Sequence, residues 1–112
     1  MDIYNKIFGK IEEFVWDIGN ITKNKQKHNV DTNECEEVFF NKPIIFFDDA
    51  VHSTNEKRYG ALGITNESRK LAIVFTIREN KIRVITAHDQ SRQDRKTYEQ
   101  ELSKHDERNN KK

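Results

Sequence analysis

The hydrophobic pattern of the first fifteen residues has the period of an amphipathic helix. Apolar side chains recur three or four positions apart, with acidic residues and lysines between them. The stripe consists of Ile3, Tyr4, Ile7, Phe8, Ile11, Phe14 and Val15. We therefore expect an extra N-terminal helix, covering residues 1–13. Its apolar face either docks on the core of the domain or contacts a partner or a second copy of the chain.

Capping residues predict two further helices. Asp17 is a suitable N-cap for a helix that begins next to it, and Asn29 can adopt the left-handed conformation that ends a helix. Asp31 and Glu34 have the spacing of a capping box, which predicts that another helix begins there. Pro43 prevents this helix from continuing.

After Pro43 the pattern becomes extended, and four segments with strand character follow. They span residues 44–47, 57–65, 71–78 and 81–88. A two-residue turn at Glu79 and Asn80 would place Arg78 opposite Lys81. If that register continues without interruption, His88 lies on the core face of the hairpin, together with Leu71, Ile73, Phe75, Ile77, Ile82 and Val84.

The last helix is predicted from a capping pair and one apolar pair. Ser91 and Asp94 have the spacing of a capping box, and Tyr98 and Leu102 are four residues apart on one helical face. Order is expected to end near Ser103, because residues 104–112 are polar and unpatterned and form a disordered tail. The expected fold is a single α+β domain over residues 1–112, with N-terminal helices, a four-stranded antiparallel meander sheet and a C-terminal helix.

Composition narrows the class of protein. Hydrophobic residues make up 34% and charged residues 35% of the 112 residues, and the net charge is +1. The single cysteine, Cys35, excludes an internal disulfide framework and a multi-cysteine metal site, and its spacing predicts a buried position in the third helix. The sequence contains neither an apolar run long enough for a membrane span nor the apolar core of a signal peptide, so we expect a soluble, cytoplasmic protein. Basic residues cluster in two places, at Lys23, Lys25, Lys27 and His28, and at Arg92, Arg95 and Lys96.

Several spaced motifs then resemble the BrnT family, in the order in which that family has them. The first half carries Trp16-Asp17, Asn24, Lys27-His28, Val30, Val38-Phe39 and Pro43, followed by His52-Ser53, Glu56 and Arg58. The second half carries Thr76-Ile77-Arg78, Ile82-Arg83-Val84-Ile85-Thr86-Ala87, Ser91-Arg92, Arg95, Tyr98 and Glu99. The resemblance extends from about Phe14 to Glu99 and rests on the ordered set of motifs.

The resemblance implies a RelE-like fold and a toxin of a type II toxin-antitoxin system. Such a toxin is a metal-independent ribonuclease, needs no cofactor, cleaves mRNA and arrests translation. The resemblance also implies a ribbon-helix-helix antitoxin, which forms a hetero-oligomer with the toxin, blocks it and lets the complex bind operator DNA.

This sequence departs from the family pattern at several positions. Asn20 replaces a common lysine, Asn29 replaces a glycine, and His88 occupies the position of an arginine. Asp89-Gln90 fills a pair that is normally basic or apolar. The alternative function is therefore a catalytically degenerate member that acts as an antitoxin-binding or regulatory interaction module. A third possibility is an interaction protein whose functional part is the N-terminal helix.

Metal-free cleavage of RNA requires a base for the 2′-hydroxyl, an acid for the leaving 5′-oxygen and cations that face the phosphate. His88 is a candidate acid or base, because imidazole titrates near neutral pH. Glu56 is a second candidate base, although it can instead orient Arg58. The candidate catalytic residues are His88, Glu56, Arg58 and Arg83. The alternative is that His88 packs or caps in the core and that the arginines are solvated or ion-paired.

The candidate RNA-binding residues are Lys27, His28, Arg78, Arg92 and Arg95. Arginine suits this role because its planar guanidinium binds phosphate oxygens in pairs. Lys27 and His28 also fit a purely structural role, because the helix dipole favours cations at a helix C-terminus. His28 and His52 lack a carboxylate-histidine spacing that would support a metal site, so no metal is expected.

Overall fold

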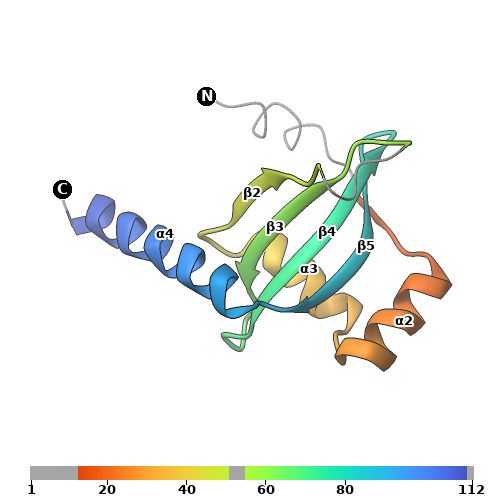
Figure 1. The fold of residues 1–112 in the computed structure, drawn as a ribbon, viewed down its shortest axis with the longest axis horizontal. Helices are drawn as coiled ribbons and strands as arrows, with labels where there is room; N and C mark the ends of the chain where they lie inside the picture. Colours follow the sequence, from red (N-terminus) through yellow and green to blue (C-terminus); the bar gives the residue numbers. More distant parts are fainter. Residues whose placement is uncertain (1–12, 51–54, 111–112) are drawn as a thin grey trace.

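The computed structural model describes residues 13–50 and 55–110, with side chains up to Lys104. Within these residues, three helices and a five-stranded mixed sheet form an α+β fold (Figure 1). In chain order the elements are β1 (Glu13–Val15), α2 (Ile18–His28), α3 (Thr32–Phe40), β2 (Ile45–Asp48), β3 (Tyr59–Ile64), β4 (Lys70–Arg78), β5 (Lys81–Asp89) and α4 (Arg92–Asn110).

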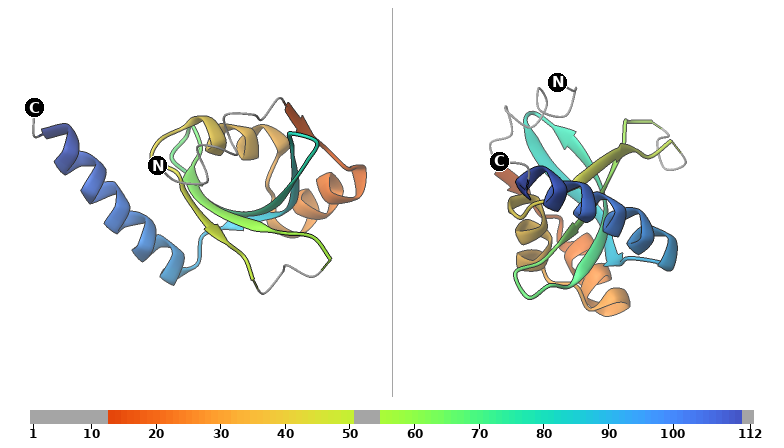
Figure 2. Two further views of the ribbon diagram at one scale, coloured as in Figure 1. Left: turned by 90° about the horizontal axis from the view of Figure 1, so that it is seen from above. Right: turned by 90° about the vertical axis from the view of Figure 1, so that its left-hand side faces the viewer.

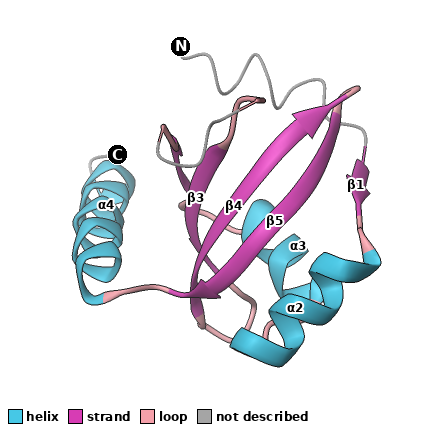
Figure 3. Ribbon diagram, turned by 45° about the vertical axis from the view of Figure 1, so that its right-hand side comes forward, coloured by secondary structure: helices cyan, strands magenta, loops and turns pink. Residues whose placement is uncertain are grey.

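The sheet has one strand more than the sequence predicts. Strands β2 to β5 form the expected antiparallel meander, but β1 adds a parallel strand at the β5 edge, in the order β1-β5-β4-β3-β2. Phe14 pairs with Ile82 and Val15 with Arg83, so the end of the predicted N-terminal helical stripe is a strand (Figure 3). A three-residue strand is too short to show a period of its own. The remainder of that helix, residues 1–12, lies outside the described residues.

The caps of α2 and α3 confirm the sequence prediction. The Asp17 carboxylate accepts hydrogen bonds from the backbone N–H groups of Gly19 and Asn20, at 2.8 and 3.4 Å. Asn29 ends α2 in the left-handed conformation, with φ of 55°. The Glu34 carboxylate accepts a hydrogen bond from the Asp31 backbone N–H at 3.0 Å, as in a capping box.

The β4–β5 hairpin begins in the expected register and then changes it. Arg78 pairs with Lys81, and both turn residues have positive φ, as a type I′ turn requires. Val84 pairs with Phe75, but the next pair is Thr86 with Val74, so Ile85 is an extra residue and forms a β-bulge. The strand reverses its faces beyond Ile85. The prediction that His88 points to the core is therefore wrong.

The core lies between the sheet and α3, which packs on β3 and β4. Val38 and Phe75 are fully buried there, and Cys35 is 1% exposed, as its helical spacing predicts. Burial raises the pKa of the Cys35 thiol to about 12, so the group stays a neutral thiol. The sheet curves around α3, and α2 packs beside β5 (Figure 2).

Helix α4 is attached to the domain near its N-terminal end and then leads away from it (Figure 2). Tyr98 is fully buried, and its hydroxyl donates a hydrogen bond of 2.6 Å to the Pro43 carbonyl. The helix continues to Asn110, beyond the end expected near Ser103. Among the described residues, no helix is both long and apolar enough to span a membrane.

Two glycines of β3 allow a test of the packing on the two sheet faces. A Cβ at Gly63 would lie 2.5 Å from Cγ1 of the buried Val38, whereas a Cβ at Gly60 would meet the ring of Phe47, which is 41% exposed. We expect Gly63→Ala to lower the free energy of unfolding by about 1–3 kcal/mol, because Val38 has no room to move. The Phe47 ring can rotate away, so Gly60→Ala serves as the matched control and costs less. Urea denaturation measures both, and a larger loss for Gly60→Ala would contradict this description of the core.

Candidate functional site

Two histidines from different elements come together at the end of the sheet opposite the β4–β5 turn. His28 is the last residue of α2, and His88 is the penultimate residue of β5. Their ring centroids are 5.5 Å apart and the rings are tilted by 55°. Both line an open depression of about 650 Å³, together with Gln26, Lys27, Asn29 and Asp89. The sequence predicts roles for both histidines. The predicted pairing of β4 with β5, however, places His88 on the core face and does not bring it next to His28.

A hydrogen bond defines the tautomer of His88. Its Nδ1 lies 2.9 Å from the backbone carbonyl oxygen of Asp89, which can only accept. Nδ1 therefore carries a proton, and Nε2 is the nitrogen that gains or loses one. The ring can thus act as an acid or a base through one defined atom.

The surroundings of His28 favour its neutral form. Partial burial lowers the pKa of His28 below 6.5, and the nearby charges of His88, Lys27 and Lys23 lower it further. Asp89 acts in the opposite direction. The lowered pKa makes His28 a candidate for a group that is neutral near physiological pH and can accept a proton.

Side chains of α2 fix the position of His28 relative to β5. The Asn20 amide donates a hydrogen bond of 3.1 Å to the Val84 carbonyl. The amide oxygen of Asn24 accepts one of 3.3 Å from the Ala87 N–H, and Asn24 is 3% exposed. These two contacts lie on either side of the bulged residue Ile85, so α2 binds the part of β5 that the bulge displaces.

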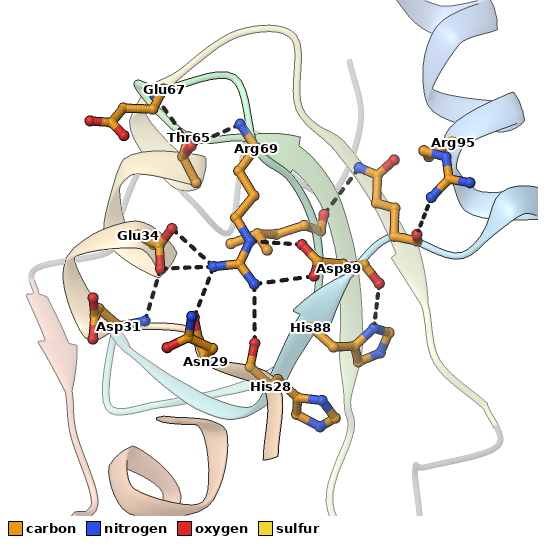
Figure 4. A network of polar contacts seen from close by, with 12 residues as sticks. His28, Asn29, Asp31, Glu34, Thr65, Glu67, Arg69, His88, Asp89 and Arg95 are labelled. Carbon is orange, nitrogen blue, oxygen red and sulfur yellow. Dashed lines mark hydrogen bonds and ion pairs between the residues drawn. The ribbon is translucent and has the colours of Figure 1, made fainter. Parts of the chain in front are cut away.

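A single arginine, Arg69, joins the segments that carry the two histidines (Figure 4). Its guanidinium contacts both oxygens of Asp89, at 2.7 and 3.2 Å, and both oxygens of Glu34, at 3.1 and 3.2 Å. It also donates to the backbone carbonyls of His28 and Asn29, at 3.0 and 2.9 Å. The hydrogen bond to Arg69 holds the pKa of the Asp89 carboxyl below its usual range, and the same contact raises the pKa of Arg69. Arg69 is not among the residues predicted from the sequence, because an arginine in a polar turn resembles any solvated residue.

Four of the other candidates gather at the opposite end of β4 and β5. Glu56 accepts two hydrogen bonds of 2.8 Å from Arg78, and these bonds lower the pKa of the Glu56 carboxyl. The charges of Arg58 and Arg83 lower it as well, so both lie near this carboxylate. Arg83 also donates to Asp17 at 3.1 Å. The sequence suggests Arg58 as the partner of Glu56. In the structure both oxygens of Glu56 accept hydrogen bonds from Arg78.

Arg83 and His88 are five positions apart on β5, or roughly 15 Å along an extended strand. The residues proposed for catalysis from the sequence therefore belong to two clusters and not to one. Arg83 lines a second depression, of about 290 Å³, together with Val15, Arg78, Glu79 and Lys81. The remaining candidates, Arg92 and Arg95, are exposed on α4, where Arg95 donates a hydrogen bond of 2.9 Å to the Gln90 carbonyl. Among the residues with described side chains, no three histidine, cysteine or acidic groups are arranged to hold a metal ion.

Comparisons with known proteins place the chain in a family. The model of the family described as "Ribonuclease toxin, BrnT, of type II toxin-antitoxin system" matches residues 16–94. No curated protein sequence matches the chain. Among solved structures, the crystal structure of the Brucella abortus ribonuclease toxin BrnT superposes with a TM-score of 0.53, at 22% sequence identity, over 71% of this chain and 97% of that chain. This likeness shows a shared fold, and the family match covers more than half of the 112 residues. The chain belongs to the BrnT family of type II toxin-antitoxin ribonuclease toxins.

Proposed function

We propose that this protein is a metal-independent endoribonuclease that cleaves mRNA, arrests translation and is neutralised by a cognate antitoxin. The observation that carries the proposal is the pair formed by His28 and His88, 5.5 Å apart over an open depression. Two imidazoles supply the base and the acid that cleavage of a phosphodiester requires at neutral pH.

The proposed reaction uses the 2′-hydroxyl of the RNA as its nucleophile. Neutral His28 takes the proton of this hydroxyl, and the 2′-oxygen attacks the adjacent phosphorus. Protonated His88 donates the proton on Nε2 to the leaving 5′-oxygen. The P–O5′ bond breaks, and the products are a 2′,3′-cyclic phosphate and a free 5′-hydroxyl. This assignment follows from the lowered pKa of His28 and from the Nδ1 hydrogen bond of His88.

Cations beside the pair can bind the RNA backbone. Lys23 and Lys27 are exposed on α2, and their charges act on His28. Farther along the sheet, Arg58, Arg78 and Arg83 form a second positive area, where they can contact phosphates upstream or downstream of the cleaved bond. Arg92 and Arg95 extend the basic surface onto α4. Glu56 orients Arg78 in this scheme and is not the base, because its two hydrogen bonds favour the ionised and weakly basic form.

Family membership implies a cognate antitoxin. We propose that the antitoxin is of ribbon-helix-helix type, that it forms a hetero-oligomer with this chain in the cytoplasm, and that operator DNA is bound only through that complex. The competing function is a degenerate toxin that retains only the antitoxin contact. The ion pairs of Arg78 with Glu56 and of Arg83 with Asp17 favour it, because arginines engaged in this way also serve purely structural roles.

Substitution of the histidines tests the catalytic proposal. We expect His28→Asn and His88→Asn each to slow cleavage of an mRNA by the antitoxin-free protein by about 10²–10⁴-fold, which is the usual contribution of a general acid or base. His105→Asn, on the distal part of α4, is the matched control and should cleave normally. Gel analysis of 5′-labelled transcripts measures the rates. Full activity of a folded His28→Asn or His88→Asn protein would exclude the proposed roles.

The pH dependence gives a second test. The profile of kcat/KM should be bell-shaped, because one histidine must be neutral and the other protonated. The acid limb reports His28, and we expect its midpoint below 6.5, since burial and the neighbouring positive charges lower the pKa of His28. An acid limb above 6.5, or one that persists in His28→Asn, would contradict this assignment.

Expression without an antitoxin separates an active toxin from a degenerate one. We expect induction of the unaltered chain to stop growth and to produce cleaved messages with cyclic phosphate ends, which primer extension and end-group analysis detect. His88→Arg keeps a cation at this position but cannot donate a proton near neutral pH, so it should relieve the arrest. Harmless expression of the folded, unaltered chain would favour the degenerate alternative. Unchanged arrest with His88→Arg would show that His88 is not the acid.

A further inference from the structure

Arg69 contacts three separate parts of the chain with one guanidinium group. It lies in the turn between β3 and β4, and its partners are the C-terminal end of α2, the first turn of α3 and the last residue of β5. The side chain is 25% exposed and makes all of these contacts at 2.7–3.2 Å. The short loop of residues 29–31 joins α2 to α3, whereas Arg69 and the end of β5 lie far from both in the sequence.

The contacts of Arg69 are adjacent to the two histidines. It binds the backbone carbonyl of His28 itself, and it binds the carboxylate of Asp89, the residue that follows His88. The Asp89 backbone carbonyl also holds His88 Nδ1. A movement of either partner away from Arg69 would therefore change the separation or the tilt of the two rings.

We propose that Arg69 is a positioning residue of the candidate site, which fixes His28 against His88 and prevents the Asp89 carboxylate from pairing with either imidazole. The catalytic consequence rests on the proposed ribonuclease function, whereas the positioning itself does not. The charged and titratable groups that face the pair are Lys23 and Lys27 from α2, Asp89 from β5, and Arg69 with Glu34 from the β3–β4 turn and α3.

Arg69 also acts on the two histidines electrostatically, through the carboxylate of Asp89. A carboxylate next to an imidazole stabilises the charged ring and raises its pKa. Asp89 already has this effect on His28, but Arg69 engages both of its oxygens. Arg69 thereby limits the effect, and one histidine stays neutral. Without Arg69 the Asp89 carboxylate would be released beside two imidazoles, and both would hold their protons to higher pH.

Lysine cannot replace Arg69 fully. The guanidinium donates from Nε, Nη1 and Nη2 in fixed directions, and each nitrogen is used. A lysine ammonium is a single point charge, which can pair with Asp89 or Glu34 but cannot also reach both helix carbonyls. Arg69→Lys should therefore restore part of the charge balance and little of the geometry.

Titration of the histidine rings by NMR tests the proposal without any activity measurement. In the full chain, with ring signals assigned from single His→Asn variants, we expect Arg69→Gln to raise the pKa of His28 and His88 by about 0.5–1 unit. Asp89→Asn should shift both pKa values downward, because it removes the negative charge beside the imidazoles and leaves the Arg69 cation in place. The double variant Arg69→Gln/Asp89→Asn should return them toward the starting values, and Arg69→Lys should give an intermediate shift.

Glu34→Gln is the matched control. It removes the second carboxylate of Arg69 and weakens the junction of α2 and α3, but it leaves the contact between Arg69 and Asp89 in place. It should lower stability with little change in the two pKa values. Equal shifts in Glu34→Gln and Arg69→Gln, or no shift in Arg69→Gln, would overturn the proposal. If Arg69→Gln does not fold, the intermediate shift expected for Arg69→Lys decides the question, and its absence would overturn the proposal equally.

Cleavage assays on the same variants separate this inference from the proposed function. For Arg69→Gln we expect kcat to fall about 10–100-fold with KM little changed, and the acid limb of the pH profile to move upward. The expected NMR shifts in a protein that never cleaves RNA would leave the positioning role standing and refute the ribonuclease function. Active RNA cleavage with unshifted histidines in Arg69→Gln would refute the positioning role alone.

Discussion

The ends of two helices and of one strand meet at the guanidinium of Arg69. A helix C-terminus leaves carbonyl groups without partners inside the helix, and it favours a cation. The end of α2 obtains both from Arg69, which binds the carbonyls of His28 and Asn29. The positive charge is balanced by Glu34 from α3 and Asp89 from β5. Because Arg69 and Glu34 are both about one-quarter exposed, water screens this part of the network less than it screens a surface ion pair. Arg69 therefore connects α2, α3 and β5 at this end of the domain, and the amides of Asn20 and Asn24 add further contacts between α2 and β5.

Residues close together in the sequence account for the correctly predicted parts of the fold. The caps of α2 and α3 are interactions between residues two to five positions apart, and the turn at Glu79 and Asn80 requires only two residues that tolerate positive φ. The bulge at Ile85 has no comparable signal, because it depends on the pairing of β5 with β4 and on the amides that α2 offers to the displaced backbone. One extra residue moves every later side chain of β5 to the opposite face of the sheet. The predicted register is correct up to Val84 and places His88 on the wrong face. Strand β1 was missed for a related reason, because its three residues fit the end of a helical stripe equally well.

The candidate site could be predicted as a set of residue types but not as an arrangement. The sequence identifies His28, Lys27 and His88 separately, and their proximity depends on contacts between α2 and β5 that span about sixty positions. The sequence also suggests a single group of Glu56, Arg83 and His88. In the structure Glu56 and Arg83 lie near the turn of the β4–β5 hairpin, whereas His88 lies at its other end. The pairing of Glu56 with Arg78 is a contact between residues 22 positions apart, and neither residue signals it locally. Arg69 carries no sequence signal of its function, since all of its partners come from other elements.

According to the sequence resemblance, His88 stands where the family has an arginine, and a histidine there changes the chemistry available at the end of β5. An arginine at this position stays charged at every physiological pH, so it can hold a phosphate but cannot exchange a proton with it. A histidine loses part of that electrostatic attraction and gains a titratable nitrogen, and in this chain the nitrogen lies beside a second imidazole. Two imidazoles this close cannot both be charged at little cost, so double protonation of the pair is disfavoured. A singly protonated pair contains one base and one acid. Under the proposed function, the residue that first argues against catalysis would therefore supply, together with His28, the proton-transfer groups that metal-free cleavage needs.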